Sequence, residues 1–263
     1  MHPQSKRTAI VWLRRDLRLS DNPALRAALA SHDYVVPLYI HAPEEESPWS
    51  AGAASSWWLH HSLKQLDQDL RSLGSRLFIA QGSSYECLKQ TIRSYHADSV
   101  LWNRVYEPAL IARDSVIKSG LKAKGLTCHS FNASLLNEPH EIQSQAGTPY
   151  RVFSAYWRKC QSDLYSLSPP HARPRQIFTP EAVNSTLDID DLELLDSHNW
   201  HQSFHEYWQP GEQAAQQKLA GFIDDQLADY RIDRDIPGIA GTSRLSPHLH
   251  FGEISPGQAI WAA

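Results

Sequence analysis

Short apolar runs alternate with longer helical stretches over the first half of the chain. Residues 9–13 are continuously apolar, which is typical of a strand buried on both faces of a sheet. Further β-rich runs at 34–40, 77–80, 100–102 and 127–131 alternate with helical spacing at 53–73, 84–96 and 108–124. Crossovers of this length predict a Rossmann-like, doubly wound, parallel five-stranded sheet with helices on both faces.

Capping residues mark several ends of these predicted helices. Asn22 and Pro23 suit an N-cap and a first helical position. Gly74 and Gly125 follow helical spacing and suit the position after a C-cap. Ser255 and Pro256 repeat the starting signal near the end of the chain. That last helix continues to residue 263 without a cap, so we expect the chain to be part of a longer protein.

The alternation ends after residue 131. Residues 132–150 form a polar loop, 153–164 a short aromatic helix, and 165–211 a proline-rich stretch with little periodicity, as in a connection between domains. Four aromatic residues predict that this stretch packs: Trp200, Phe204, Tyr207 and Trp208. Helical spacing returns at Glu212 and places Tyr230 at the end of a helix. We therefore predict an α/β domain at 1–134, a linker at 135–211 and the start of a helical domain at 212–263.

Composition places the chain among ordinary globular proteins. Of its 263 residues 41% are hydrophobic and 21% charged, so a packed core is expected. It lacks both an apolar run of membrane-spanning length and a signal-peptide pattern, so we expect a cytoplasmic protein without membrane contact. The three cysteines are widely spaced and the histidines scattered, so we expect neither a disulfide framework nor a metal site.

The net charge limits the kinds of nucleic-acid binding that we expect. The value of −4 argues against coating nucleic acid by bulk charge but leaves room for a local basic patch. The nine Trp and ten Tyr residues favour an aromatic core over a site for flat ligands.

One segment has the chemistry of an anion site. Residues 241–246 place three hydroxyls and the Arg244 guanidinium beside a glycine that permits close backbone approach, as in an anion-binding nest suited to a diphosphate. The alternative is a polar turn in which Ser246 caps the following helix. Upstream, Tyr230 could stack near a ligand, and Arg231 and Arg234 could face a phosphate backbone or pair with neighbouring aspartates.

A second basic segment follows the first predicted strand. Arg14, Arg15 and Arg18 could bind an anion at the carboxyl edge of the sheet, or hold their turn through Asp16 and Asp21. The sequence contains neither the glycine-rich dinucleotide fingerprint nor a Walker lysine at this turn.

Four motifs in order resemble the DNA photolyase/cryptochrome family. They are residues 11–25 (VWLRRDLRLSDNPAL), 102–108 (WNRVYEP), 148–159 (TPYRVFSAYWRK) and 235–255, which contains GTSRLSPHLHFGEIS. The resemblance implies an N-terminal α/β domain that holds an antenna chromophore and an all-α domain that binds a U-shaped FAD. It is closest to the cyclobutane pyrimidine dimer photolyases. In these enzymes light-excited reduced FAD passes an electron to a dimer flipped out of UV-damaged DNA.

The resemblance also implies roles for single residues. The matching FAD contacts are Tyr230, Thr242, Ser243, Arg244, Leu245 and Ser246. Arg234 matches a DNA contact, and the protein would act as a monomer. The family's other FAD contacts, its electron-transfer tryptophans and its dimer pocket would lie beyond residue 263. No catalytic residue is therefore expected in this chain, which should fold in its α/β half and bind FAD weakly or not at all.

Two alternatives and one departure accompany the resemblance. A cryptochrome-type blue-light photoreceptor would share these motifs, and a stand-alone α/β nucleotide-binding module would need residues 212–263 to be unrelated to flavin. Folate-type photolyases carry an Asn-Glu pair where this chain has Ala109 and Leu110. A folate antenna held in that way is therefore not expected, which leaves a deazaflavin, another flavin or an empty pocket.

Overall fold

A single parallel sheet forms the centre of the molecule. The computed structural model describes residues 6–164, 167–181, 187–196 and 198–263. Its strands are β1 (Thr8–Leu13), β2 (Tyr34–His41), β3 (Phe78–Gln81), β4 (Ser99–Asn103) and β5 (Thr127–Phe131). They lie in the order β3-β2-β1-β4-β5, all parallel, with Ile10 opposite Val36 on one side and Val100 on the other. The predicted five-stranded, doubly wound sheet is confirmed.

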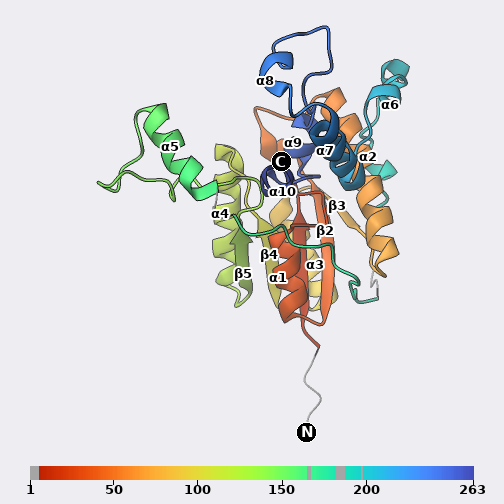
Figure 1. The fold of residues 1–263 in the computed structure, drawn as a ribbon. Coiled ribbons are helices and arrows are strands. Elements are labelled where there is room, and N and C mark those ends of the chain that lie inside the picture. The colour runs from red at the N-terminus through yellow and green to blue at the C-terminus, as the bar shows by residue number, and fades with distance from the viewer. Residues whose placement is uncertain (1–5, 165–166, 182–186, 197) are drawn as a thin grey trace.

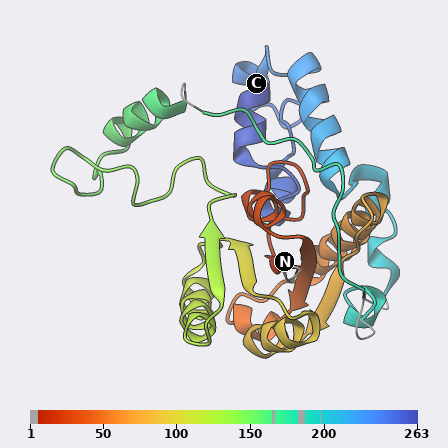
Figure 2. The same ribbon diagram turned by 90° about the horizontal axis from the view of Figure 1, so that it is seen from below.

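Helices cover both faces of this sheet (Figures 1 and 2). Along β1, Ala9, Val11 and Leu13 face a cluster built with α1 (Pro23–Ser31) and α2 (Ala53–Ser72). Ile10 and Trp12 face the opposite cluster with α3 (Ser84–Tyr95) and α4 (Pro108–Lys122). Because side chains alternate along a strand, burial of both faces requires the continuous apolar run seen in the sequence.

The predicted ends of the helices that cover the sheet agree with the structure to within two residues. Asn22 caps α1 by accepting a hydrogen bond from the Leu25 amide at 3.1 Å. Gly74 (φ +81°) and Gly125 (φ +82°) follow α2 and α4 in the left-handed conformation that favours glycine. Local sequence chemistry therefore decides where these helices stop.

Part of the connecting stretch packs on the sheet. The Ile177 amide donates to the Leu73 carbonyl and the Val35 amide to the Phe178 carbonyl, so this segment runs beside β2 and the end of α2. Ile177, Ile189 and Leu192 are buried in the same cluster as α2, and Leu192 ends the 3-10 turn η2 (Asp190–Leu192).

The aromatic residues of this stretch behave unequally. Phe204, which begins α6 (Phe204–Tyr207), and Trp208 pack against the α2 cluster. Trp200, in the 3-10 turn η3 (Asn199–His201), and Tyr207 are exposed. The expected packing therefore holds for two of the four. The division into domains stays a prediction.

One helix stands apart from the body of the molecule. α5 (Phe153–Leu164) has the predicted bounds and projects on extended chain away from the sheet in both views (Figures 1 and 2). Its Phe153 and Trp157 rings are stacked and largely exposed.

The last fifty residues are helical but end their first helix earlier than predicted. α7 (Glu212–Asp225) ends where the Gln226 and Leu227 amides both donate to the Phe222 carbonyl, the second through an i→i−5 bond that closes the helix end. Tyr230 therefore begins the short α8 (Tyr230–Asp233) instead of closing the preceding helix. In the parts of the chain that the structure describes, no helix is long and apolar enough to cross a membrane.

Two further helices complete this region. α10 (Pro256–Ala262) starts as predicted, with Ser255 and Gln258 forming a reciprocal capping box. α9 (Ser246–Phe251) starts one residue earlier than expected: Leu245 is the N-cap and Ser246 the first helical residue, so the capping role considered for Ser246 is wrong. The physical reason is the backbone of Leu245, which already has helical dihedral angles.

Candidate cofactor sites

The motif at 241–246 borders a hollow of about 260 Å³ between α7 and the loop before α9. We call it the α7 hollow. Nine residues line it: Lys218, Gly221, Phe222, Asp225, Gln226, Ala240, Thr242, Ser243 and Arg244. The structure thus brings Lys218 of α7 to the same concave surface as the two hydroxyls and the guanidinium of residues 242–244.

The backbone of this loop has the form that binds anions. Arg244 has a φ of +49°, a left-handed conformation that costs a non-glycine residue on the order of 1–3 kcal/mol. Leu245, which follows it, is right-handed, and such an alternation turns successive N–H groups toward one side. Leu245 itself is buried in a small cluster with Ala215, Leu219 and Ile254. Packing of Leu245 in this cluster stabilises the conformation of the loop.

Gly241 serves its own loop. A Cβ atom at this position would collide with the carbonyl of Asp233. Only glycine therefore allows the backbone at residue 241 to approach the backbone at the end of α8. The close approach expected of this glycine is therefore made by the chain itself.

Tyr230 and Arg234 lie beside the hollow and do not line it. The Tyr230 ring meets the edge of Phe222, which forms a wall of the hollow, at 5.7 Å between centroids. Arg234 lies over the Tyr230 ring at 5.8 Å and is 3.7 Å from the Asp235 carboxylate. An exposed pair of this kind contributes little to stability. The Arg234 side chain is 52% exposed and is therefore accessible to a ligand. Ser246 also lies outside the set of lining residues.

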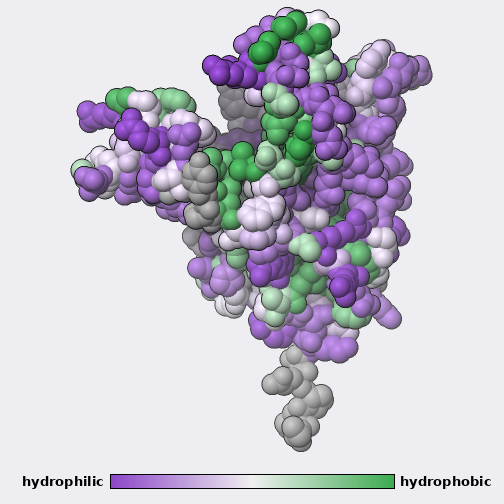
Figure 3. Space-filling view, in the orientation of Figure 1, coloured by the Kyte–Doolittle hydropathy of each residue, from purple (hydrophilic) through white to green (hydrophobic). Residues whose placement is uncertain are grey.

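Apolar surface adjoins this region. Figure 3 shows it at the top of the molecule, over α8 and the loop that follows. Ile232, Ile236 and Ile239 are 68%, 44% and 46% exposed. Exposed apolar residues gathered in this way mark an interaction surface more often than an ordinary solvent face.

A second hollow of about 240 Å³ opens at the carboxyl edge of the sheet. We call it the sheet-edge hollow. Trp12, Tyr39 and Leu110 form part of its apolar lining, together with Phe251 and the highly exposed Trp49. Its position agrees with the crevice that a doubly wound sheet predicts at the ends of its strands. Arg14 and Arg15 line it as expected, whereas Arg18 does not.

The three arginines of the first turn have different roles. Arg14 forms a buried ion pair with Asp114 at 2.5 Å and donates to the Asn103 carbonyl. Burial lowers the pKa of its guanidinium and the Asp114 charge opposes that effect. Arg18 is completely enclosed and donates to backbone carbonyls, of which those of Ala133 and Gly252 belong to distant segments. Arg14 and Arg18 therefore hold the protein together.

Arg15 faces the sheet-edge hollow with acidic partners. It pairs with Glu46, 3.3 Å away, and with Glu107. Burial and then the Glu46 charge raise the pKa of Tyr39, while burial and then Arg15 lower the pKa of His250. The hollow thus combines aromatic walls with a mixed-charge polar rim, a combination typical of sites for flat, partly polar ligands.

Glu253 is a structural centre that the sequence did not single out. Its carboxylate is fully buried and accepts hydrogen bonds from Trp58 Nε1 (3.1 Å), the Gly211 amide (2.7 Å) and Ser62 Oγ. Its other oxygen lies 2.5 Å from His248 Nδ1. The available signal was its place in the motif at 235–255. This one side chain ties α2, the start of α7 and α9 together.

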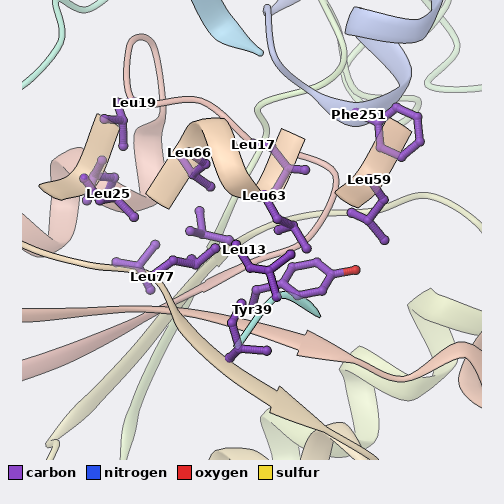
Figure 4. Close-up of a cluster of buried hydrophobic side chains, with 14 of the residues drawn as sticks. Leu13, Leu17, Leu19, Leu25, Tyr39, Leu59, Leu63, Leu66, Leu77 and Phe251 are labelled. Atoms are coloured by element: carbon purple, nitrogen blue, oxygen red, sulfur yellow. The ribbon is translucent and has the colours of Figure 1, made fainter. Parts of the chain in front are cut away.

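α9 connects the two hollows. Arg244 lines the α7 hollow just before this helix, and His250 and Phe251 at its other end line the sheet-edge hollow. Phe251 lies beside Leu59 at the edge of the core cluster (Figure 4), and its carbonyl accepts from the Leu17 amide at 3.1 Å. At six residues the helix spans only about 9 Å.

The combination of a sheet-edge hollow with the hydroxyl- and arginine-bearing loop at 241–246 can be compared with known proteins. A family model described as DNA photolyase matches residues 9–175. This chain belongs to the DNA photolyase family. The resemblance inferred from the four motifs is therefore confirmed.

Individual relatives cover almost the whole chain. The deoxyribodipyrimidine photo-lyase of Agrobacterium fabrum is 42% identical over 97% of this chain and 52% of its own length. Cryptochrome-1 of Arabidopsis thaliana is 38% identical over 94% of this chain and 36% of its own length. The chain thus spans about half, or less, of the length of these relatives.

Solved structures agree. A bacterial class III photolyase from Agrobacterium tumefaciens superposes with a TM-score of 0.90 at 39% identity, covering 98% of this chain and 53% of that one. An archaeal photolyase from Sulfolobus tokodaii, solved with two FAD molecules, superposes with a TM-score of 0.77 at 25% identity, covering 97% of this chain and 54% of that one. The α/β architecture predicted from the sequence is that of the family.

Proposed function

We propose that this chain forms the antenna-binding half and the first wall of the FAD pocket of an enzyme that repairs cyclobutane pyrimidine dimers in DNA with light. The observation that carries the proposal is the α7 hollow, where two hydroxyls, two cations and a left-handed arginine backbone converge. That chemistry suits a diphosphate bridge. FAD bound there would supply the light-driven electron transfer.

The residues of the motif divide into three roles under this proposal. Thr242 and Ser243 donate hydroxyl hydrogen bonds to phosphate oxygens, and Arg244 adds charge. Leu245 anchors the loop in the core below. Tyr230 packs beside the cofactor through its contact with the Phe222 wall.

Arg234 supports a DNA contact. Its guanidinium is about half exposed, and its ion pair with Asp235 is a loose surface one at 3.7 Å. A phosphate contact there would position the duplex without reading its sequence. Replacing Arg234 by Gln should raise the KM for irradiated DNA several-fold and leave the flavin absorbance unchanged. Loss of flavin from this variant would contradict the assignment.

The sheet-edge hollow is the proposed site of the antenna chromophore. Leu110, where folate-type relatives carry a carboxylate, lies in its lining and makes that side apolar. This favours a flavin or deazaflavin ring over a folate held by an acid. A bulky Leu110→Trp variant should lose the second chromophore's absorbance and retain FAD. Extraction of a folate from the wild-type protein would refute the choice of ring.

Repair is tested on the protein as its gene encodes it. Visible light should remove dimers from a UV-irradiated oligonucleotide, and a dark control should leave them. The 38% identity to a plant cryptochrome makes a photoreceptor the second candidate. Bound, reduced FAD with no loss of dimers under light would favour that candidate and exclude repair.

A further inference from the structure

A lysine outside the recognised motif faces the proposed phosphate site. Lys218 lies on α7 and lines the same hollow as Thr242, Ser243 and Arg244. Among the residues that the structure describes, neither Lys218 nor Arg244 has a carboxylate within ion-pair distance. Asp225 also lines the hollow without reaching either cation. The hollow therefore presents two cations without a direct ion-pair partner, together with the Asp225 carboxylate.

The core fixes the position of both cations. Lys218 immediately precedes Leu219 and Arg244 immediately precedes Leu245, and these two leucines belong to the same buried cluster. The Lys218 Nζ also lies over the Trp208 ring, 5.4 Å from its centroid, in a cation–π contact. The approach of the two charges is thus a consequence of packing and not of chance side-chain positions on the surface.

The start of α7 is held independently. Both oxygens of Glu212 accept hydrogen bonds from backbone amides in the loop between β1 and α1. The donors are the amides of Leu19, at 2.7 Å, and Ser20, at 2.9 Å. Glu212 is itself buried. α7 therefore cannot rotate to carry Lys218 away from the loop without breaking these bonds.

The two cations of the α7 hollow lie close enough to affect each other electrostatically. Burial and then the charge of Arg244 lower the pKa of Lys218, so the two like charges oppose each other across the hollow. A doubly charged phosphate group between them would replace this repulsion by two attractions. Charge-assisted hydrogen bonds from Lys and Arg to phosphate are among the stronger polar contacts in proteins.

We propose that Lys218 is a second cationic ligand of the cofactor's diphosphate and a determinant of affinity for diphosphate-containing nucleotides. This inference rests on the proposed function, because it takes the α7 hollow to be the FAD phosphate site. It adds a ligand from α7, so that the diphosphate is held from two elements instead of one loop.

The test compares four variants of the protein as its gene encodes it, freed of flavin and titrated with FAD and with ADP. Lys218→Gln should weaken both ligands by about ten-fold or more, as expected for one lost charge-assisted hydrogen bond. Lys218→Arg should remain within about three-fold of wild type, since it keeps the charge. Lys122→Gln, an exposed change of equal charge on α4, is the matched control and should have no effect. Arg244→Gln reports on the site itself.

The possible outcomes separate the two proposals. If Arg244→Gln weakens binding and Lys218→Gln does not, the role of Lys218 is wrong and the phosphate site stands. If neither variant weakens FAD or ADP, both the role of Lys218 and the placement of the diphosphate are wrong. Equal losses in Lys218→Gln and Lys218→Arg, with a lowered melting temperature, would show a packing role and also overturn the inference.

Discussion

Removal of the buried Glu253 carboxylate should loosen the joint between the sheet and the helical region. In Glu253→Ala, three donors lose their acceptor: Trp58 Nε1, Ser62 Oγ and the Gly211 amide. His248, also fully buried, loses its partner. All of these groups lie in the interior, where water cannot replace the lost bonds without entering the core.

The expected loss follows from the number of groups affected. Each buried donor left unsatisfied costs roughly 1–3 kcal/mol, and the relief of burying a carboxylate offsets part of the sum. Breaking a buried pair typically costs about 3–5 kcal/mol, which we take as the net loss in the free energy of unfolding. For a chain of this size that corresponds to a fall in Tm of roughly 6–20 °C. Glu253→Gln keeps one acceptor oxygen and should lose about 1–3 kcal/mol.

Urea unfolding followed by tryptophan fluorescence measures this loss, with Trp58 beside the altered site as one of the reporters. The matched control is Glu206→Ala on the exposed side of α6, which should change the free energy of unfolding by less than about 0.5 kcal/mol. A Glu253→Ala variant within about 1 kcal/mol of wild type would refute the reasoning, because the buried donors would then have found other partners.

Three further predictions follow from other features. Burial, and then the charges of His60 and other neighbours, lowers the pKa of His61 to about 4. The unfolded chain therefore takes up a proton near pH 6.5 that the native state refuses, so the free energy of unfolding should fall as pH drops from 6.5 toward 4. Urea titrations should show a smaller acid-induced fall in the free energy of unfolding for His61→Gln than for wild type. His129→Gln should show the same fall as wild type. Gly252→Ala should lose at least about 2 kcal/mol of stability, because φ is +68° and the new Cβ would meet the Arg15 carbonyl. Thermal or urea unfolding measures this loss. The control is Gly221→Ala, which has open space around it and should be neutral or stabilising. The 263-residue chain alone should fold yet bind FAD weakly, as judged by visible absorbance after reconstitution; a stoichiometric, slowly exchanging flavin would contradict this.

Local patterns in the sequence were sufficient for the sheet and its helices. The continuous apolar run at residues 9–13 predicted a strand buried on both faces, and Asn22, Gly74 and Gly125 marked helix ends that the structure confirms. These signals succeed because periodicity and capping depend on neighbours along the chain. The predicted end of α7 and the predicted start of α9 were wrong because backbone bonds of the last and first turns decide them, and those bonds leave little trace in residue type.

The anion site was visible in part. Hydroxyls and arginine at 241–246 gave the loop its chemistry, and the four motifs gave the family. The sequence alone left open whether Arg14 and Arg18 bind a ligand or hold the fold. The structure assigns both to ion pairing and backbone bonds, since their partners come from segments far away in the chain.

The sequence by itself determined the order of strands and helices, the chemistry of the loop before α9 and the family to which the chain belongs. The tertiary structure decided which groups lie together: Lys218 and Arg244 at one hollow, Glu253 with Trp58 and Gly211, and the end of α9 at the sheet-edge hollow. The reason is physical. Periodicity and capping act over a few residues, whereas burial of an acid or convergence of two cations depends on how distant elements pack against one core.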